Sequence, residues 1–255
     1  MRKTTDNLEA YDYYLHGAEF LNRFTSEALA QARQMFEKAI EVDPQYAQAY
    51  AMVSWTYWLE WFWYGGQDQT LERAFQLAQK AVALNDSLPV AHVGLGYVYL
   101  FKKQHEQAVA EVERAVAVDP NFPAGYSALA DILCFVERGE ESIGLIEKAM
   151  RLNPRYPASY LATLGFAYLV TGRYGEAVDA LKKALSRNPN FLGAHMMLAV
   201  VYSELGREEE ARAELAAGLR LRPNLFLELV KQRLPFKDRA VLERYLDGLR
   251  KAGLK

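Results

Sequence analysis

The chain has 255 residues with a formal net charge of −2, and 51% of its residues are hydrophobic. A net charge this close to zero indicates no broad basic surface for nucleic acid or an anionic membrane, and no apolar run approaches the ~18 residues that a membrane-spanning helix needs. The single cysteine, Cys134, excludes an internal disulfide framework and is typical of a reducing compartment, so we expect a cytoplasmic protein.

The chain begins with two predicted helical hairpins, at about 10–46 and 47–88. The second helix of each hairpin carries small residues in the pattern Ala-x3-apolar-x2-Ala. Spacings of four and three place these residues on one helical face, where small side chains let a neighbouring helix approach closely. The two instances are Ala32, Phe36 and Ala39, followed by Ala74, Ala78 and Ala81.

Four further predicted hairpins follow at about 89–122, 123–157, 158–191 and 192–225. Prolines mark them at steps of 34, 35 and 34 residues, and a period near 34 is typical of a helix–turn–helix solenoid. The same small-residue pattern recurs in each second helix. Its four instances are Ala108/Val112/Ala115, Ser142/Ile146/Ala149, Ala177/Leu181/Ala184 and Ala211/Leu215/Gly218.

Glycine also recurs inside the predicted first helices, at Gly96 and Gly165. Glycine within a helix costs about 1 kcal/mol relative to alanine, so its recurrence at one position indicates a close contact between helices. Gly172 and Gly206 fall where the first helix should end, in the left-handed position that favours glycine.

The last segment, 226–255, does not fit the repeat but has apolar residues at helical spacing. Asp238 could cap the start of a helix there and Gly253 its end. We expect this segment to be a C-terminal cap that docks on the sixth hairpin, because a terminal repeat needs a polar outer face. The predicted fold is an all-α, right-handed superhelical solenoid of six helix–turn–helix repeats, at 1–225, followed by capping helices.

The repeats resemble the tetratricopeptide repeat (TPR), and six copies agree in phase over residues 10–225. The resemblance implies a concave groove, lined by the first helix of each pair, that binds a protein or peptide partner. Counting from the pattern gives twelve groove positions: Tyr14, Trp55, Trp58, Leu59, Val93, Tyr97, Leu100, Phe101, Asp131, Phe135, Phe166 and Leu169.

This predicted groove is apolar, with Asp131 as its main charge. It favours a hydrophobic or amphipathic partner segment. Two other interpretations remain open. A tight superhelix would bury part of its own inner face, and the start of the chain or its tail could fold back into the groove. Self-association into a homodimer is the functional alternative to binding a separate partner.

The second hairpin carries about eight extra residues and all four tryptophans of the chain. Trp61, Phe62, Trp63 and Tyr64 form a candidate hot spot, because Trp and Tyr are enriched at binding sites. Alternatively, the first helix of this hairpin runs on by two turns and packs these rings against its neighbours. A membrane contact is disfavoured because basic residues do not flank the segment.

The sequence contains no recognisable catalytic, nucleotide-binding or metal-ligand motif. His92 and His195 fall at equivalent repeat positions, which favours a packing role over a ligand role. Cys134 has no histidine at an activating spacing. We therefore expect no enzyme activity, no cofactor and no metal.

Several stretches resemble a more specific setting, the C-terminal TPR region of bacterial class III adenylate and guanylate cyclases. They include YWLEWFW, FKKQHEQA, TGRYGEA, YSELGREEEAR and RLPFKD. The resemblance extends into the non-repeat tail. It implies a regulatory or assembly module that accompanies a cyclase domain and is not itself the catalyst. Such cyclases work as dimers, which is the basis of the self-association alternative.

Overall fold

The computed structural model describes residues 5–21, 23 and 25–255, and these residues form helices joined by short turns, without strands. This confirms the predicted all-α class. The chain divides after Pro120 into two compact units, called unit 1 and unit 2 below, and each is described by itself.

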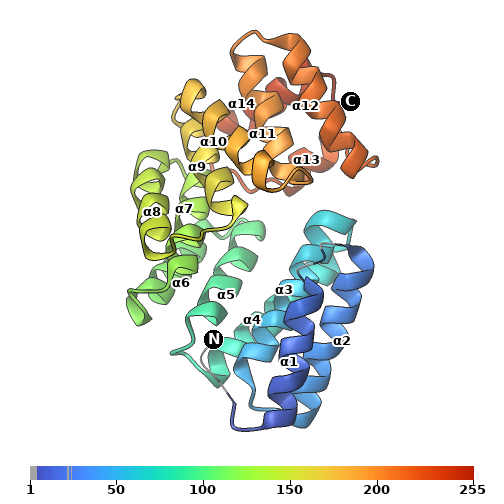
Figure 1. The fold of residues 1–255 in the computed structure, drawn as a ribbon, viewed down its shortest axis with the longest axis vertical. Coiled ribbons are helices and arrows are strands. Elements are labelled where there is room, and N and C mark those ends of the chain that lie inside the picture. The colour runs from blue at the N-terminus through green and yellow to red at the C-terminus, as the bar shows by residue number, and fades with distance from the viewer. Residues whose placement is uncertain (1–4, 22, 24) are drawn as a thin grey trace. The chain divides into compact units, whose positions relative to one another are not determined.

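Unit 1 contains three helical hairpins, in which each helix packs mainly on its partner and on the next hairpin (Figure 1). Its helices are α1 (Leu8–Leu21), α2 (Ser26–Val42), α3 (Ala47–Tyr64), α4 (Asp68–Leu84), α5 (Pro89–Phe101) and α6 (His105–Val118).

Unit 2 contains three more hairpins and a two-helix tail. Its helices are α7 (Pro123–Phe135), α8 (Gly139–Leu152), α9 (Ala158–Val170), α10 (Tyr174–Arg187), α11 (Leu192–Glu204), α12 (Glu208–Leu221), α13 (Leu227–Arg233) and α14 (Arg239–Ala252).

The small residues of the repeat lie where the helices of each hairpin meet. Ala108, Val112 and Ala115 on α6 are completely buried, and their counterparts on the other second helices are buried too. The recurring glycines on the first helices face these positions. A Cβ added to Gly96 would lie 2.4 Å from Val112 Cγ2, and one added to Gly165 would lie 2.6 Å from Leu181 Cγ. The close helix contact predicted from the glycines is therefore confirmed.

The turns inside four successive hairpins contain a left-handed residue at the same place. The backbone φ is +60° at Lys103, +65° at Glu137, +75° at Gly172 and +70° at Gly206. Glycine adopts this conformation without strain, whereas a residue with a Cβ is strained by it. The repeat therefore imposes a left-handed backbone at this position even where the residue is Lys103 or Glu137 instead of glycine.

Helix α3 carries most of the insertion of the second hairpin. It has 18 residues, whereas α5 has 13, and it ends at Gly65 in a left-handed conformation with φ +83°. This agrees with the interpretation in which the first helix runs on. The extension carries Trp61–Tyr64.

The tail begins with the short helix α13 and continues through a loop into α14. Asp238 caps α14, since its side chain accepts a hydrogen bond from the Ala240 N–H, and Gly253 ends the helix with φ +107°. Both caps are as predicted. Helix α14 packs against α11 and α12 of the last hairpin (Figure 1).

Candidate protein-binding surfaces

Unit 1 carries a cluster of five aromatic rings, called the aromatic face, on α3 and α5: Trp55, Trp58, Phe62, Tyr97 and Phe101. The Trp58 ring is at its centre, with its centroid 4.5 Å from Trp55, 5.6 Å from Phe62, 5.5 Å from Tyr97 and 5.4 Å from Phe101. Steps of three and four residues along α3 bring its three rings to one side of the helix.

The aromatic face is partly open. Trp58 and Phe101 are only 7% and 8% exposed, whereas Trp55, Phe62 and Tyr97 are half-buried. Trp58 Nε1 is buried and has no hydrogen-bond partner among the described residues. An unsatisfied buried donor costs about 1–3 kcal/mol. The indole N–H at the centre of the face therefore has no hydrogen-bond acceptor among the described residues.

The remaining predicted positions of the second and third hairpins have different environments. Leu59 and Val93 are half-buried. Trp61 is buried with its ring 5.8 Å from that of Phe101, Trp63 meets Phe62 edge-on at 4.6 Å, and Tyr64 is exposed. The four rings of the candidate hot spot thus differ in exposure, from the buried Trp61 to the exposed Tyr64, and Phe62 lies within 6.5 Å of Trp61 as well as beside Trp63.

Two of the predicted groove positions belong to the interior. Tyr14 is 2% exposed, and its ring lies 5.4 Å from Phe36 and 5.5 Å from Tyr46. Burial raises the pKa of Tyr14 to about 12, and its hydroxyl accepts a hydrogen bond from Gln48 Nε2 at 2.7 Å. Leu100 is completely buried. The prediction that these two side chains face a groove is wrong, because their positions on α1 and α5 turn toward the neighbouring helices.

In unit 2 the tail covers the predicted groove residues. The Phe236 ring lies 5.1 Å from Phe135 and 5.9 Å from Phe166, and these two rings are 4.8 Å apart. The Lys237 N–H donates a hydrogen bond of 2.8 Å to the Phe135 carbonyl at the end of α7. Phe135, Phe166 and Leu169 are consequently buried, while Asp131 is half-buried. Of the open alternatives, return of the tail is the one that applies here.

Helix α14 extends this covering along α11. Ser203 Oγ donates a hydrogen bond of 2.8 Å to the Gly248 carbonyl. A Cβ on Gly248 would lie 2.9 Å from Val200 Cγ1, so a glycine at this place lets the two helices approach. The Pro235–Phe236 pair and Gly248 could have signalled this docking, but both lie outside the repeat pattern and were not singled out from the sequence.

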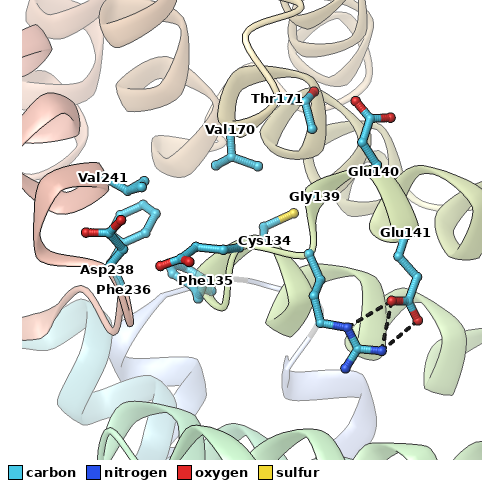
Figure 2. Close-up of a pocket in the computed structure, with 12 residues that line it drawn as sticks. Cys134, Phe135, Gly139, Glu140, Glu141, Val170, Thr171, Phe236, Asp238 and Val241 are labelled. Carbon is cyan, nitrogen blue, oxygen red and sulfur yellow. Dashed lines mark hydrogen bonds and ion pairs between the residues drawn. The ribbon is translucent and has the colours of Figure 1, made fainter.

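Unit 2 also has a cavity of about 370 Å³ beside the docked tail, which the sequence analysis did not predict (Figure 2). Three separate segments contribute to it: the α7–α8 turn, the end of α9 and the start of α14. Its lining consists of Cys134, Phe135, Glu137, Arg138, Gly139, Glu140, Glu141, Val170, Thr171, Phe236, Asp238 and Val241.

Cys134 has the environment of an interior residue, although it lines this cavity. Burial raises the pKa of its thiol, which favours the protonated and unreactive form. Its Sγ lies 3.3 Å from the Ala130 carbonyl and 3.2 Å from Ser142 Oγ. The thiol is therefore part of the packing between α7 and α8.

His92 and His195 each lie between two hydrogen-bond acceptors. His92 Nδ1 is 2.7 Å from Glu111 Oε2, and Nε2 is 2.7 Å from the Asp86 carbonyl. His195 makes the same contacts with Glu214, at 2.6 Å, and with the Pro189 carbonyl, at 2.9 Å. The equivalence inferred from the repeat extends to the hydrogen bonds.

Within the described residues, no group of three or more His, Cys, Asp or Glu side chains could hold a metal ion. None of the helices there has both the length and the apolar character that a membrane span requires.

Comparison with known proteins identifies the repeats. A family model described as "Tetratricopeptide repeat" matches residues 67–132 and 171–231. The chain is also similar to "Putative adenylate cyclase 3" of Rhizobium meliloti (strain 1021), with 32% identity over 102 residues. The matched region is 39% of this chain and 17% of that protein, so the match spans less than a fifth of that relative.

Solved structures share the fold at low sequence identity. The chain superposes on the APC/C hetero-tetramer Cut9–Hcn1 with a TM-score of 0.66 and 19% identity, over 96% of this chain and 46% of that one. It also superposes on TTC0263, a TPR protein of Thermus thermophilus, with a TM-score of 0.60 and 22% identity, over 80% and 99% of the two chains. Together with the family match, this likeness in fold means that the repeats of this chain are tetratricopeptide repeats.

Proposed function

We propose that this chain is a protein-binding module whose aromatic face receives an apolar or amphipathic segment of a partner protein. The main support is the partial exposure of Trp55, Phe62 and Tyr97 around the buried ring of Trp58. Clustered aromatic side chains of this kind are typical of binding hot spots. A carbonyl oxygen of a bound segment would also supply the acceptor that Trp58 Nε1 lacks among the described residues.

The contrast with unit 2 supports this assignment. There the corresponding rings, Phe135 and Phe166, are covered by Phe236 of the chain's own tail. In unit 2, the first helices of the hairpins therefore receive both an aromatic side chain and a backbone hydrogen bond from a segment outside the repeats.

We further propose that the chain is the regulatory or scaffolding region of a bacterial nucleotidyl cyclase, acting in the cytoplasm and without catalysis of its own. The similarity to the Rhizobium meliloti protein supports this setting. A segment of this kind would regulate or localise the cyclase by holding a partner, or by pairing two cyclase chains through the aromatic face.

The test measures binding of a synthetic amphipathic helix, made of leucine and lysine, by tryptophan fluorescence. A scrambled peptide of the same composition is the ligand control. We expect the amphipathic peptide to bind and the double variant Trp55→Glu/Tyr97→Glu to weaken binding by at least about tenfold, or about 1.4 kcal/mol. Leu205→Glu, at an exposed site in unit 2, is the matched protein control and should bind normally.

Equal binding by both variants, or equal binding of the scrambled peptide, would contradict the proposal. Light scattering of the purified chain over a hundredfold concentration range separates the two modes of action. A dimer that the double variant splits would indicate self-association, whereas a monomer that binds the peptide would indicate a separate partner.

A further inference from the structure

The tail segment that docks on unit 2 is extended and presents one aromatic side chain. Residues Leu234–Asp238, with the sequence Leu-Pro-Phe-Lys-Asp, lie between α13 and α14, and the residues at both ends of this segment have extended backbone angles. Phe236 packs on Phe135 of α7 and Phe166 of α9, and the Lys237 N–H donates a hydrogen bond to the Phe135 carbonyl. Two successive first helices of this chain thus bind an extended aromatic segment.

Helix α5 of unit 1 has the same register as α9 of unit 2. Tyr97 directly follows Gly96, and Phe166 directly follows Gly165. Each of these glycines faces the middle residue of the small-residue pattern on the second helix of its hairpin. Tyr97 therefore occupies in α5 the place that Phe166 has in α9.

Helix α3 corresponds in the same way to α7, and α3 packs against α5 as α7 packs against α9. Ser54 on α3 and Ala130 on α7 are each joined by a hydrogen bond of 2.7 Å to the first small residue of the second helix. Leu59 and Phe135 each lie five residues further along the chain. The place between Leu59 and Tyr97 is therefore the equivalent, in unit 1, of the place that the tail fills in unit 2.

This place in unit 1 is apolar and more open than its counterpart. Leu59 and Tyr97 are half-buried, as is Trp55, whose ring lies 5.5 Å from that of Tyr97. By contrast, Phe135 and Phe166 are buried under the tail. The half-buried side chains of unit 1 leave apolar surface that a segment like the tail would cover.

The indole N–H of Trp58 favours an extended segment over a helix at this place. The Trp58 ring lies 5.5 Å from that of Tyr97, and its Nε1 has no acceptor among the described residues. In a helix the backbone carbonyls accept hydrogen bonds from amides one turn further on, except in the last turn. An extended segment instead offers a carbonyl at each residue.

We propose that the place between Leu59 and Tyr97 binds an extended segment of a partner protein in which an aromatic residue follows a proline. This inference rests on the proposed function and names the class of partner for the aromatic face. The aromatic ring packs on Trp55 and Tyr97, as Phe236 packs on its two neighbours in unit 2. The proline holds the residue before it in an extended conformation, as Pro235 does in the tail.

The experiment measures the anisotropy of a fluorescein-labelled peptide, Leu-Pro-Phe-Lys-Asp between flexible Gly-Ser flanks, as the full chain is added. One matched probe replaces the phenylalanine with alanine. A second keeps the phenylalanine but replaces the proline with alanine and the flanks with helix-forming alanine and lysine. We expect saturable binding of the first peptide and at least about tenfold weaker binding of both matched probes.

Substitutions in the chain locate the binding. Tyr97→Ala should weaken binding of the phenylalanine peptide by at least about tenfold, and Trp55→Ala is a second variant with the same expected effect. Leu205→Ala, at an exposed site in unit 2, is the control and should bind normally. Circular dichroism should show the variants folded. Equal binding by the control and by a folded Tyr97→Ala or Trp55→Ala variant would overturn the inference.

The outcomes also separate this inference from the proposed function. If the leucine–lysine helix binds to the aromatic face and the phenylalanine peptide does not, the inference is wrong and the proposed function stands. Binding of either matched probe as tightly as the phenylalanine peptide would overturn the inference in the same way. Absence of binding by both the helix and the phenylalanine peptide would overturn both.

Discussion

His92 and His195 are held in a way that stabilises their charged form. Each ring nitrogen faces an acceptor, a glutamate carboxylate on one side and a backbone carbonyl on the other, and only a doubly protonated ring can donate to both. The hydrogen bond to Glu111 is the main cause that raises the pKa of His92, opposed by burial. The bond to Glu214 does the same for the pKa of His195.

This arrangement predicts a pH-dependent contribution to stability. A raised pKa in the folded state means that the stabilisation is fully present below the unfolded value near 6.5 and is lost as pH rises through the folded pKa. We expect the difference in unfolding free energy between the wild type and His92→Gln to shrink from pH 6 to pH 9, as measured by urea denaturation. Each tenfold difference in proton affinity corresponds to about 1.4 kcal/mol.

Glu111→Gln is the control for this prediction. It removes the carboxylate but keeps a hydrogen-bonding group, so the chain should lose most of the pH dependence that His92 contributes. A difference between wild type and His92→Gln that stays constant over this range would contradict the assignment of a charged ring.

Two glycines of α5 should respond in opposite directions to the same substitution. A Cβ at position 96 would lie 2.4 Å from Val112 Cγ2 and 3.1 Å from the Ala108 carbonyl, whereas one at position 94 would meet nothing within 4 Å. Gly96→Ala should destabilise the fold by about 1–3 kcal/mol through overpacking. Gly94→Ala should stabilise it by about 0.5–1 kcal/mol, since alanine is the better helix former. Thermal unfolding of the two variants measures this, and a shift of the same sign in both would refute it.

At the scale of elements, the hairpins and the tail differ in how far the sequence predicted them. The hairpins could be predicted because their signals lie within one or two helices. Examples are the small residues of α6, the glycine at position 96 of α5, and Gly172 in the turn after α9. That the first helix of the second hairpin runs on, as α3 does, was one of two open interpretations. Its rings pack partly on Phe101 of α5, which only the fold could determine.

Phe236 is the aromatic anchor of the tail on Phe135 and Phe166. Phe236→Ala should destabilise unit 2 by about 3–5 kcal/mol, the cost of truncating a buried phenylalanine, because it removes the contacts with Phe135 and Phe166. Phe226→Ala, at a 50% exposed site of the same tail, is the control and should change stability little. Denaturant unfolding measures both, and equal effects would mean that Phe236 does not anchor the tail.

At the scale of the whole molecule, a repeat array confines the effect of a substitution. Helices of a solenoid contact mainly their neighbours, so stability is close to a sum of local terms. In Phe236→Ala we expect amide hydrogen exchange to accelerate in α7, α9, α11 and α14 and to stay unchanged in α1–α4. Faster exchange across all helices would indicate a single cooperative unit.

The repeat architecture, the two caps of α14 and the equivalence of His92 with His195 all followed from the sequence. Each of these depends on spacing within a helix or on a fixed period, which the chain carries locally. Only the folded chain reveals that Tyr14 and Leu100 are interior and that Phe236 covers Phe135. It alone also showed that the α7–α8 turn, α9 and α14 enclose a cavity. These contacts join residues far apart in the chain, and their geometry depends on how successive helices are oriented, which no spacing along the sequence specifies.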